Sequence, residues 1–419
     1  MAPFPGYASG MNHGAAPMDT AQQLHSLHFL VAEADPVQRR ALIEALGHAG
    51  ATRVTDVPDG PTALRTLQGG FTPRVDVAVI DLALGGMDGL ELLRAIAALK
   101  SAVRLIVVGA QPAGVLFSVE TLAQAHGVDL LGTIATPVTT AKLKALLDHY
   151  QAPRQAAARP AVRRFSFAEV GLGLQKRQFE PFFQPKIELA TGQVKGLETF
   201  ARWRHPEHGV LGPGSFIDAL EQNGRVDFLD WTMIETSVER CRRYHDQGIP
   251  ISISLNLSPA TLAHPNFLRQ VTSCMQRHGV LPDYLTFEMT ESSILDFDAD
   301  FIERLVRLRM LGFGLAIDDY GTGRSNLQLL ARIPFSELKI DRSFVDGASK
   351  KRPLGTVLKS CLGLAHSLDR MSVAVGVETR QDWDFLQGLG CTYAQGYHIA
   401  NPMAADAFPG WLEDWRQFF

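Results

Sequence analysis

Short apolar runs alternate with helix-length amphipathic segments along the first third of the chain. From Leu27 onward the runs read LHFLVA, VDVAVIDL, RLIVVGA and LLGTIATPV. The segments between them fit helices, including Val37–Ala49, a helix from Leu90, and Ala141–Tyr150. Continuous apolar runs of this length are typical of strands buried on both faces of a parallel sheet. The pattern predicts a doubly wound, flavodoxin-like α/β domain over residues 26–150, with its functional crevice at the carboxyl ends of the strands.

Two stretches break this pattern. Residues 1–25 are rich in Gly, Ala, Pro and Met and show little hydrophobic periodicity, so we expect a disordered tail. Residues 151–164 contain two prolines and no apolar stripe, which is typical of a linker. The remaining residues, 165–419, have the usual length of one barrel of β/α units.

Strand-like and helix-like segments alternate again in this second part of the chain. Five of the strand-like segments carry a charged or amide side chain toward their ends, namely LETFARW, ISISLNLS, LTFEMTE, LAIDDYGTG and ELKID. In ISISLNLS the apolar residues share one face, whereas three serines and Asn256 share the other, as expected of a strand with a polar lumen side. The pattern predicts a TIM-like (β/α)8 barrel, in which the strand ends converge on one mouth.

The predicted mouth gathers carboxylates, an amide and a lysine: Glu198, Asn256, Glu288, Glu291, Asp318, Asp319, Lys339 and Asp341. Carboxylates at this density repel one another unless cations lie between them. Oxygen-rich clusters of this kind suit Mg²⁺ or Mn²⁺. The pattern therefore predicts a metal site and phosphate chemistry. Taken singly, Asn256 could be a cap, the Glu pair a solvated surface feature, and Lys339 an ion-pair partner of Asp341.

Composition narrows the class of protein. The formal net charge of −4 argues against a broadly basic surface for nucleic acid. The four cysteines are far apart and form no CxxC pair, so we expect reduced thiols. No secretory signal and no apolar stretch of about 20 residues is present, so we expect a cytoplasmic protein without a membrane span.

The order of the motifs resembles the EAL domain, a family of cyclic-di-GMP phosphodiesterases, over residues 182–402. The matching segments are FFQPKIEL, ETFARW, IDDYGTG and CTYAQGYHIANP. The resemblance implies hydrolysis of cyclic di-GMP to linear pGpG with two divalent metals, Mg²⁺ or Mn²⁺. It implies metal ligands at Glu198, Asn256, Glu288, Asp318 and Asp319. It implies substrate contacts at Gln184, Arg202 and Asp341, and catalytic or loop-positioning roles at Lys339, Glu291, Gln395 and Glu378.

One departure from the family pattern bears on catalysis. The family carries a Glu-Gly-Val-Glu run, and Val375 replaces its first Glu here. Loss of such a carboxylate can lower a rate by orders of magnitude, unless Glu378 or Glu291 fills its role. Three interpretations therefore stay open: a phosphodiesterase, a degenerate EAL protein that binds cyclic di-GMP or a protein partner as an effector, and an unrelated metal-dependent barrel hydrolase. No GG[DE]EF-like segment supports synthesis of cyclic di-GMP.

The stretch VAVIDLALGGMDGLELL resembles the receiver domain of two-component response regulators, with Asp81 at the phospho-acceptor position and Glu33 at a magnesium position. Three other positions depart from the receiver pattern, at Ala34, Gly109 and Thr136. Asp35 could replace the lost metal ligand. The domain is then either a target of a sensor histidine kinase or another signalling protein, or a docking or dimerisation unit. We expect a homo-oligomer.

Overall fold

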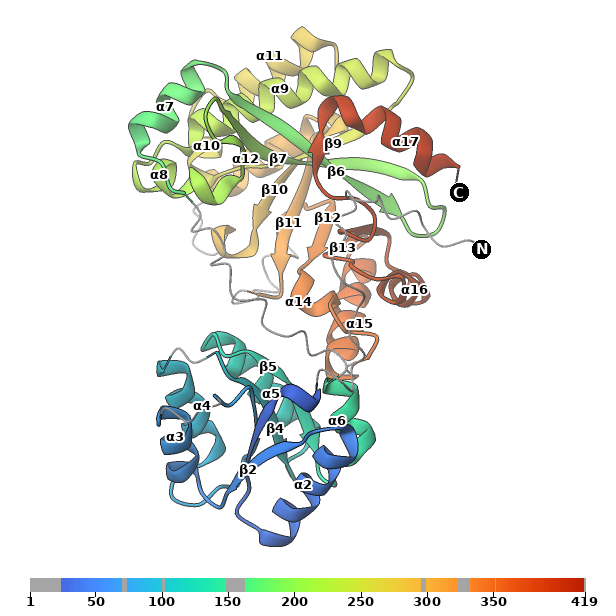
Figure 1. Ribbon diagram of the computed structural model, residues 1–419. Coiled ribbons are helices and arrows are strands. Elements are labelled where there is room, and N and C mark those ends of the chain that lie inside the picture. The colour runs from blue at the N-terminus through green and yellow to red at the C-terminus, as the bar shows by residue number, and fades with distance from the viewer. Residues whose placement is uncertain are drawn as a thin grey trace. The chain divides into compact units, whose positions relative to one another are not determined.

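The computed structural model describes residues 24–69, 74–99, 102–147, 163–294, 299–322, 330, 332–350 and 352–417. They form two compact units, one before and one after the segment 148–162 (Figure 1). Residues 1–23 of the predicted tail and 151–162 of the predicted linker lie outside the described residues, as does the end of the helix predicted over Ala141–Tyr150. Among the described helices, none is both long and apolar enough to cross a bilayer.

The N-terminal unit is a five-stranded parallel sheet with helices on both faces (Figure 1). Its strands are β1 (His28–Ala32), β2 (Arg53–Val57), β3 (Val77–Asp81), β4 (Arg104–Gly109) and β5 (Leu130–Ala135). Its helices are α2 (Pro36–Ala49), α3 (Gly60–Gln68), α4 (Gly89–Ala98), α5 (Ala113–Ala125) and α6 (Thr140–Leu147). The strand order β2-β1-β3-β4-β5 confirms the predicted flavodoxin-like fold.

The two faces of this sheet explain the unbroken apolar runs in the sequence. Along β3, Ala78 and Ile80 belong to one hydrophobic cluster, whereas Val77 and Val79 belong to a second cluster on the opposite face. Because successive side chains of a strand point to opposite faces, a strand covered on both sides must be apolar at every position. The edge strand β2 is covered less, and its sequence RVTDV is correspondingly polar.

The C-terminal unit is a closed barrel. Its strands are β6 (Phe179–Glu188), β7 (Val194–His205), β9 (Ser252–Asn256), β10 (Leu285–Thr290), β11 (Gly314–Tyr320), β12 (Glu337–Ile340), β13 (Met371–Val375) and β14 (Tyr393–Gln395). The order β6-β14-β13-β12-β11-β10-β9-β7 is closed by pairing of β6 with β7, while β8 (Gly209–Leu211) and β15 (Met403–Ala404) are added at the edges. This confirms the predicted TIM-like barrel.

The direction of β6 differs from that in a regular (β/α)8 barrel. It runs antiparallel to both β7 and β14, whereas the other neighbouring barrel strands are parallel. Only residues 189–193 separate β6 from β7. A parallel pair needs a crossover of about a dozen residues or more, so this short connection permits only an antiparallel hairpin.

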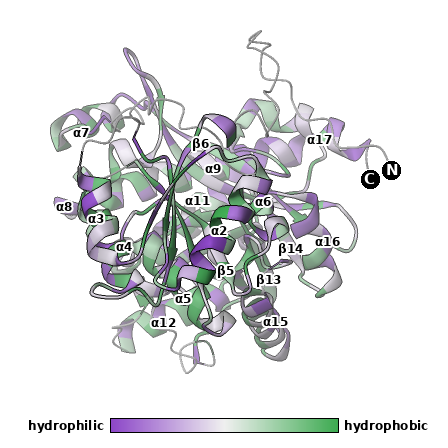
Figure 2. Ribbon diagram, turned by 60° about the horizontal axis from the view of Figure 1, so that its bottom comes forward, coloured by the Kyte–Doolittle hydropathy of each residue, from purple (hydrophilic) through white to green (hydrophobic). Residues whose placement is uncertain are grey.

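Helices surround the barrel. They are α7 (Phe167–Gln175), α8 (Ile217–Gln222), α9 (Val226–Asp246), α10 (Pro259–Ala263), α11 (Phe267–His278), α12 (Ala299–Met310), α14 (Arg342–Val345), α15 (Arg352–Ser367), α16 (Arg380–Gly388) and α17 (Phe408–Arg416). Short 3-10 turns are η1 (Pro213–Ser215), η2 (Pro282–Tyr284), η3 (Glu291–Ile294) and η4 (Ala405–Ala407). In α15, Leu354, Leu358, Leu362 and Ala365 are buried at helical spacing, and hydrophobic and hydrophilic colours alternate along that helix in Figure 2.

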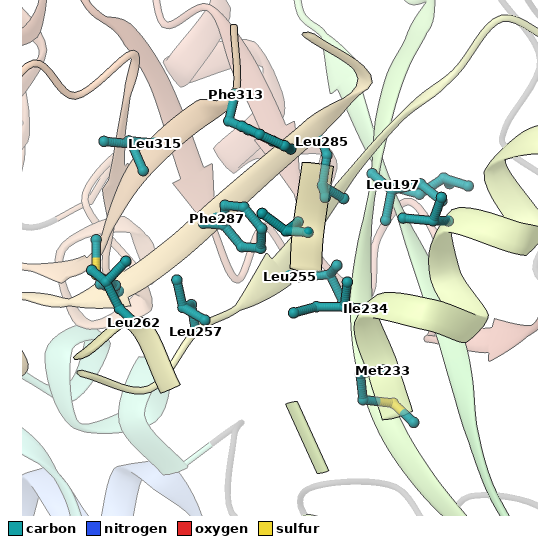
Figure 3. Packing of buried hydrophobic residues seen from close by; sticks show 14 of the residues in the cluster. Leu197, Met233, Ile234, Leu255, Leu257, Leu262, Leu285, Phe287, Phe313 and Leu315 are labelled. Atoms are coloured by element: carbon teal, nitrogen blue, oxygen red, sulfur yellow. The ribbon is translucent and has the colours of Figure 1, made fainter. Parts of the chain in front are cut away.

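The period of two along each strand separates the core from the lumen. In β10, Leu285 and Phe287 point outward and pack with Leu255 of β9 and with apolar residues of α9 and α10 (Figure 3). The residues between and after them, Thr286 and Glu288, point into the barrel. The outward layer holds the helices on the barrel, and the inward layer is therefore available for polar chemistry.

Candidate active site at the barrel mouth

A buried ion pair lies in the lumen of the barrel at the amino-terminal end of β12. The Nζ of Lys186 lies 2.5 Å from Glu337 Oε2, and both side chains are less than a tenth exposed. The same ammonium lies 5.3 Å from the ring centroid of Tyr393. Small barrels fill their interior with side chains in this way. This layer supports the site above it.

The next layer is a buried lysine surrounded by carboxylates. The Nζ of Lys339 lies 3.1 Å from Glu198 Oε2 and 3.1 Å from Asp318 Oδ2, and it also donates to Glu288. Lys339 and Glu288 are both only 2% exposed. Burial alone would lower the pKa of Lys339, but the carboxylates of Glu198, Glu288 and Asp318 raise it well above its usual value. Burial, with Glu198 next, raises the pKa of Glu288 well above its usual value. One ammonium thus faces more carboxylates than it can neutralise.

Strand register brings these groups together from distant parts of the chain. On neighbouring strands, Glu198 lies opposite Ser254, Asn256 opposite Glu288, and Thr290 opposite Asp318. Carboxylate oxygens of Glu198, Glu288 and Asp318 lie within 4.8 Å of one another. Asn256 is exposed at the strand end next to Glu288. This set of oxygen donors fits a hard divalent cation such as Mg²⁺ or Mn²⁺.

Asp319 lies at the edge of this cluster. Its backbone is in the left-handed region at φ 55°, and its amide donates to Asp318 Oδ1 at 3.0 Å. Burial, followed by the charges of Asp318 and Asp341, raises the pKa of the Asp319 carboxyl. A carboxylate held beside like charges gains from a cation between them.

Two glutamines anchor Glu198 from the side. The Nε2 of Gln395 donates to Glu198 Oε2 at 2.6 Å and to Gln184 Oε1 at 2.8 Å. Gln184 in turn donates to the carbonyl of Ala400 at 2.8 Å, so both ends of its buried amide are engaged. Gln395 Oε1 is buried and has no hydrogen-bond partner among the described residues. The pair therefore orients Glu198 and leaves one buried acceptor without a partner among the described residues. A substrate contact by Gln184 stays a prediction.

Arg202 on β7 has no acidic partner among the residues that the structure describes. No carboxylate of the described residues lies within ion-pair distance of its guanidinium, which donates to the carbonyl of Ala201 at 3.0 Å. The guanidinium lies 5.6 Å from the ring centroid of Phe182 and 5.9 Å from that of Phe200. Burial lowers its pKa. An arginine desolvated on aromatic faces and without a counter-charge is suited to an anionic ligand.

Two of the predicted residues, Glu291 and Asp341, order the backbone near the cluster. Glu291 is buried, and its Oε2 accepts from the amide of Gly321, the glycine that turns the chain after β11 at φ 98°. Asp341 caps α14 by accepting from the amide of Ser343 at 2.9 Å. These contacts suit positioning roles.

A further predicted carboxylate, Glu378, pairs with Arg342 at 2.7 Å. It follows the Val375 position by three residues. Val375 ends β13, is half-buried, and lies in register with Gln395, which contacts Glu198. The side chain at this position is apolar where the neighbouring strand supplies a hydrogen-bonding amide.

Asp230 on α9 was not among the predicted site residues. Its Oδ2 accepts from the amide and hydroxyl of Ser258, at 3.1 and 2.6 Å, and from the hydroxyl of Thr261 at 2.6 Å. The side chain is buried, and burial raises its pKa. These bonds fix the turn between β9 and α10, two residues after Asn256. An acid within the apolar run FLDWTM was the available signal.

The acidic pair of the N-terminal unit is buried at the strand ends. Asp81 Oδ2 accepts from the amide of Ala83 at 3.0 Å, and Glu33 Oε1 accepts from the amide of Asp35 at 2.9 Å. Burial raises the pKa of both carboxyls. Asp35 caps α2 by accepting from the amide of Val37 at 2.7 Å. Its carboxylate is thus engaged at the helix start, and a replacement role for Asp35 stays a prediction.

Comparison with known proteins agrees with this geometry. Residues 168–402 match the EAL domain, and residues 29–148 match the response regulator receiver domain. Cyclic di-GMP phosphodiesterase RocR of Pseudomonas aeruginosa is 33% identical over 388 residues, which cover 92% of this chain and 98% of RocR.

Two solved structures resemble the barrel part. PaMucR phosphodiesterase in complex with c-di-GMP is 33% identical, with a TM-score of 0.54, and the match covers 57% of this chain and 98% of that one. The EAL enzyme Bd1971 in its cAMP- and cyclic-di-GMP-bound form is 30% identical, with a TM-score of 0.56, and covers 59% of this chain and 68% of that one. The chain therefore belongs to the EAL domain family and carries a response regulator receiver domain ahead of its EAL barrel.

Proposed function

We propose that this protein is a cyclic-di-GMP phosphodiesterase, which opens one phosphodiester of the cyclic dinucleotide to give linear pGpG and uses two divalent cations. The observation that carries the proposal is the buried Lys339 among Glu198, Glu288 and Asp318. Arg202 lies four residues beyond Glu198 on β7 and has no acidic partner among the described residues. The likeness to RocR over nearly the whole chain supports it.

The residues of the mouth divide the work between binding and chemistry. Glu198, Asn256, Glu288, Asp318 and Asp319 would hold Mg²⁺ or Mn²⁺. When bound, these cations supply Lewis acidity and charge neutralisation at the phosphodiester. Around them, the chain's own groups bind and orient the substrate.

Arg202 binds a non-bridging phosphate oxygen through its guanidinium, which is half-buried and pairs with no acid among the described residues. Lys339 stays protonated because its surroundings raise its pKa. It therefore offsets negative charge as the phosphorus is attacked. Gln395 and Gln184 keep Glu198 in place.

A second function is favoured by one observation, Val375. If the missing carboxylate is essential, the barrel binds cyclic di-GMP without cleaving it and acts as an effector. Binding need not fall with catalysis, because Arg202 and the carboxylate cluster are retained.

Steady-state kinetics on the full-length protein and on Val375→Glu, at saturating Mg²⁺ or Mn²⁺, tests the proposal. We expect slow pGpG formation by the wild type and a kcat that Val375→Glu raises more than it changes KM. Val375→Gln is the matched control, since it has a similar size but no charge. Absence of pGpG in all three proteins, despite nucleotide binding, would reject the phosphodiesterase and favour an effector that binds cyclic di-GMP without cleaving it.

A further inference from the structure

A cluster of three metal-binding side chains lies on the outside of the barrel. Cys274 and His278 belong to α11, four residues apart, and Glu235 belongs to α9. These two helices pack against each other (Figure 1). Spacing of four residues places two helix side chains on one face, and the sulfur, nitrogen and oxygen donors of the three residues lie within 4.8 Å of one another.

Two of the donor atoms already lie at nearly the separation that a shared metal ion requires. His278 Nε2 lies 3.1 Å from Glu235 Oε1. With metal–ligand bonds of about 2.0–2.2 Å to nitrogen and oxygen, tetrahedral zinc brings such a pair to about 3.3 Å apart. Cys274 supplies the third donor and is only 1% exposed. The buried thiol closes the inner side of the cluster.

The second oxygen of Glu235 is held separately. Arg277 Nη2 lies 2.8 Å from Glu235 Oε2 and leaves Oε1 directed at His278. A ligating carboxylate is commonly oriented by such an outer hydrogen bond. Arg277 therefore occupies the outer oxygen without blocking the inner one.

Solvent reaches this cluster through a surface hollow of about 640 Å³, lined in part by Glu235, Cys274 and Ser273. A thiolate and an imidazole select zinc over magnesium, and three protein ligands leave one position open for water. We propose that Glu235, Cys274 and His278 form a Zn²⁺ site, distinct from the oxygen-rich mouth. Zinc replaces the thiol proton of Cys274, which leaves to solvent as the zinc–sulfur bond forms.

The chain offers a matched control for this site. Cys241 and His245 on α9 have the same spacing, and their Sγ and Nε2 are 3.5 Å apart. Both atoms also lie near the carbonyl of Ile251, at 3.4 and 3.0 Å. No carboxylate among the described residues completes a third ligand there. Cys241→Ser should therefore leave zinc binding unchanged.

Zinc competition with a chelating dye, on metal-stripped full-length protein, tests the proposal. Loss of an outer partner of a ligand costs about 10–100-fold in metal affinity, and Cys274→Ser and His278→Gln should each lose more than that. Because the mouth could also bind Zn²⁺, Co²⁺ is the second probe: only a thiolate site gives a near-ultraviolet sulfur-to-cobalt charge-transfer band. We expect this band in the wild type and Cys241→Ser and its absence in Cys274→Ser.

Two results would overturn the site. One is a wild-type cobalt spectrum without a thiolate band. The other is a zinc affinity that Cys274→Ser, His278→Gln and Cys241→Ser leave equal. His278→Gln guards against misfolding of the buried Cys274 variant, since His278 is partly exposed. Cleavage of cyclic di-GMP should be the same in His278→Gln and the wild type, so failure of the zinc site and failure of the proposed phosphodiesterase are separate results.

Discussion

Replacing Lys339 by Met should make the metal-free barrel much less stable and make its stability depend strongly on divalent cations. The side chain is 2% exposed and contacts three carboxylates, so its loss leaves them facing one another without a counter-charge. Breaking a buried ion pair by removing one partner costs ~3–5 kcal/mol. For a unit of about 250 residues this corresponds to a fall in Tm of ~6–20 °C.

Divalent cations should then offset part of this loss. A ligand that binds only the folded state at 100 times its Kd adds ~2.7 kcal/mol of stability. Because Lys339→Met removes a positive charge from the carboxylate cluster, we expect it to bind Mg²⁺ or Mn²⁺ more tightly than the wild type. The rise in Tm on adding the cation should therefore be larger in the variant.

Lys186→Met is the control for this experiment. Lys186 has a similarly buried ion pair with Glu337 lower in the same lumen. Its loss should lower Tm comparably, but the cation response should equal that of the wild type. Calorimetry of the three full-length proteins, with and without chelator, makes the comparison. A Lys339→Met protein whose metal-free Tm matches the wild type, or whose cation response equals that of Lys186→Met, would contradict this role of Lys339.

Three further predictions concern binding, positioning and regulation. Arg202→Ala should weaken cyclic di-GMP binding by ~10–100-fold, since a hydrogen bond to a charged group is worth ~1.5–3 kcal/mol. Calorimetric titration measures this, with Arg204→Ala as the control because the Arg204 guanidinium already pairs with Glu180. Equal affinities of the two variants would contradict the prediction. Burial raises the pKa of Asp230, so the stability that this carboxyl contributes is present below the usual Asp pKa and is lost as pH rises through the folded value. In urea unfolding, the free energy of unfolding of the wild type should therefore exceed that of Asp230→Asn by more at about pH 4 than at about pH 8. A difference that is constant or that increases with pH would contradict this. Acetyl phosphate should modify Asp81 slowly or not at all and change pGpG formation little. The reason is that a metal ligand, a hydroxyl and a lysine are missing at Ala34, Gly109 and Thr136. Stoichiometric phosphorylation, measured by intact mass, together with a large change in activity would contradict this.

Much of the fold was predictable because buried strands leave a strong apolar signal. The runs that became β1, β3, β4 and β5 were recognisable, whereas RVTDV in β2 was not, since an edge strand needs fewer apolar side chains. The antiparallel direction of β6 could have been predicted from the short connection to β7, but the barrel pattern suggested eight equivalent units.

The closeness of the central residues of the candidate site was predictable, and their detailed contacts were less so. The order of motifs identified Glu198, Glu288, Asp318 and Lys339, which the structure brings together. Asp230 contacts residues 28 and 31 positions away, Ser258 and Thr261. The acid within the apolar run FLDWTM marks Asp230 as unusual, but its partners could not be predicted because they depend on tertiary packing.

A single-turnover experiment is the most direct test of whether the protein cleaves cyclic di-GMP. Full-length protein in excess over labelled cyclic di-GMP, with Mn²⁺ or Mg²⁺, removes any limit set by product release and detects even a slow phosphodiesterase. We expect that all bound nucleotide becomes pGpG in one exponential phase, and that a chelator stops the conversion. Nucleotide that stays bound and intact under the same conditions would contradict it.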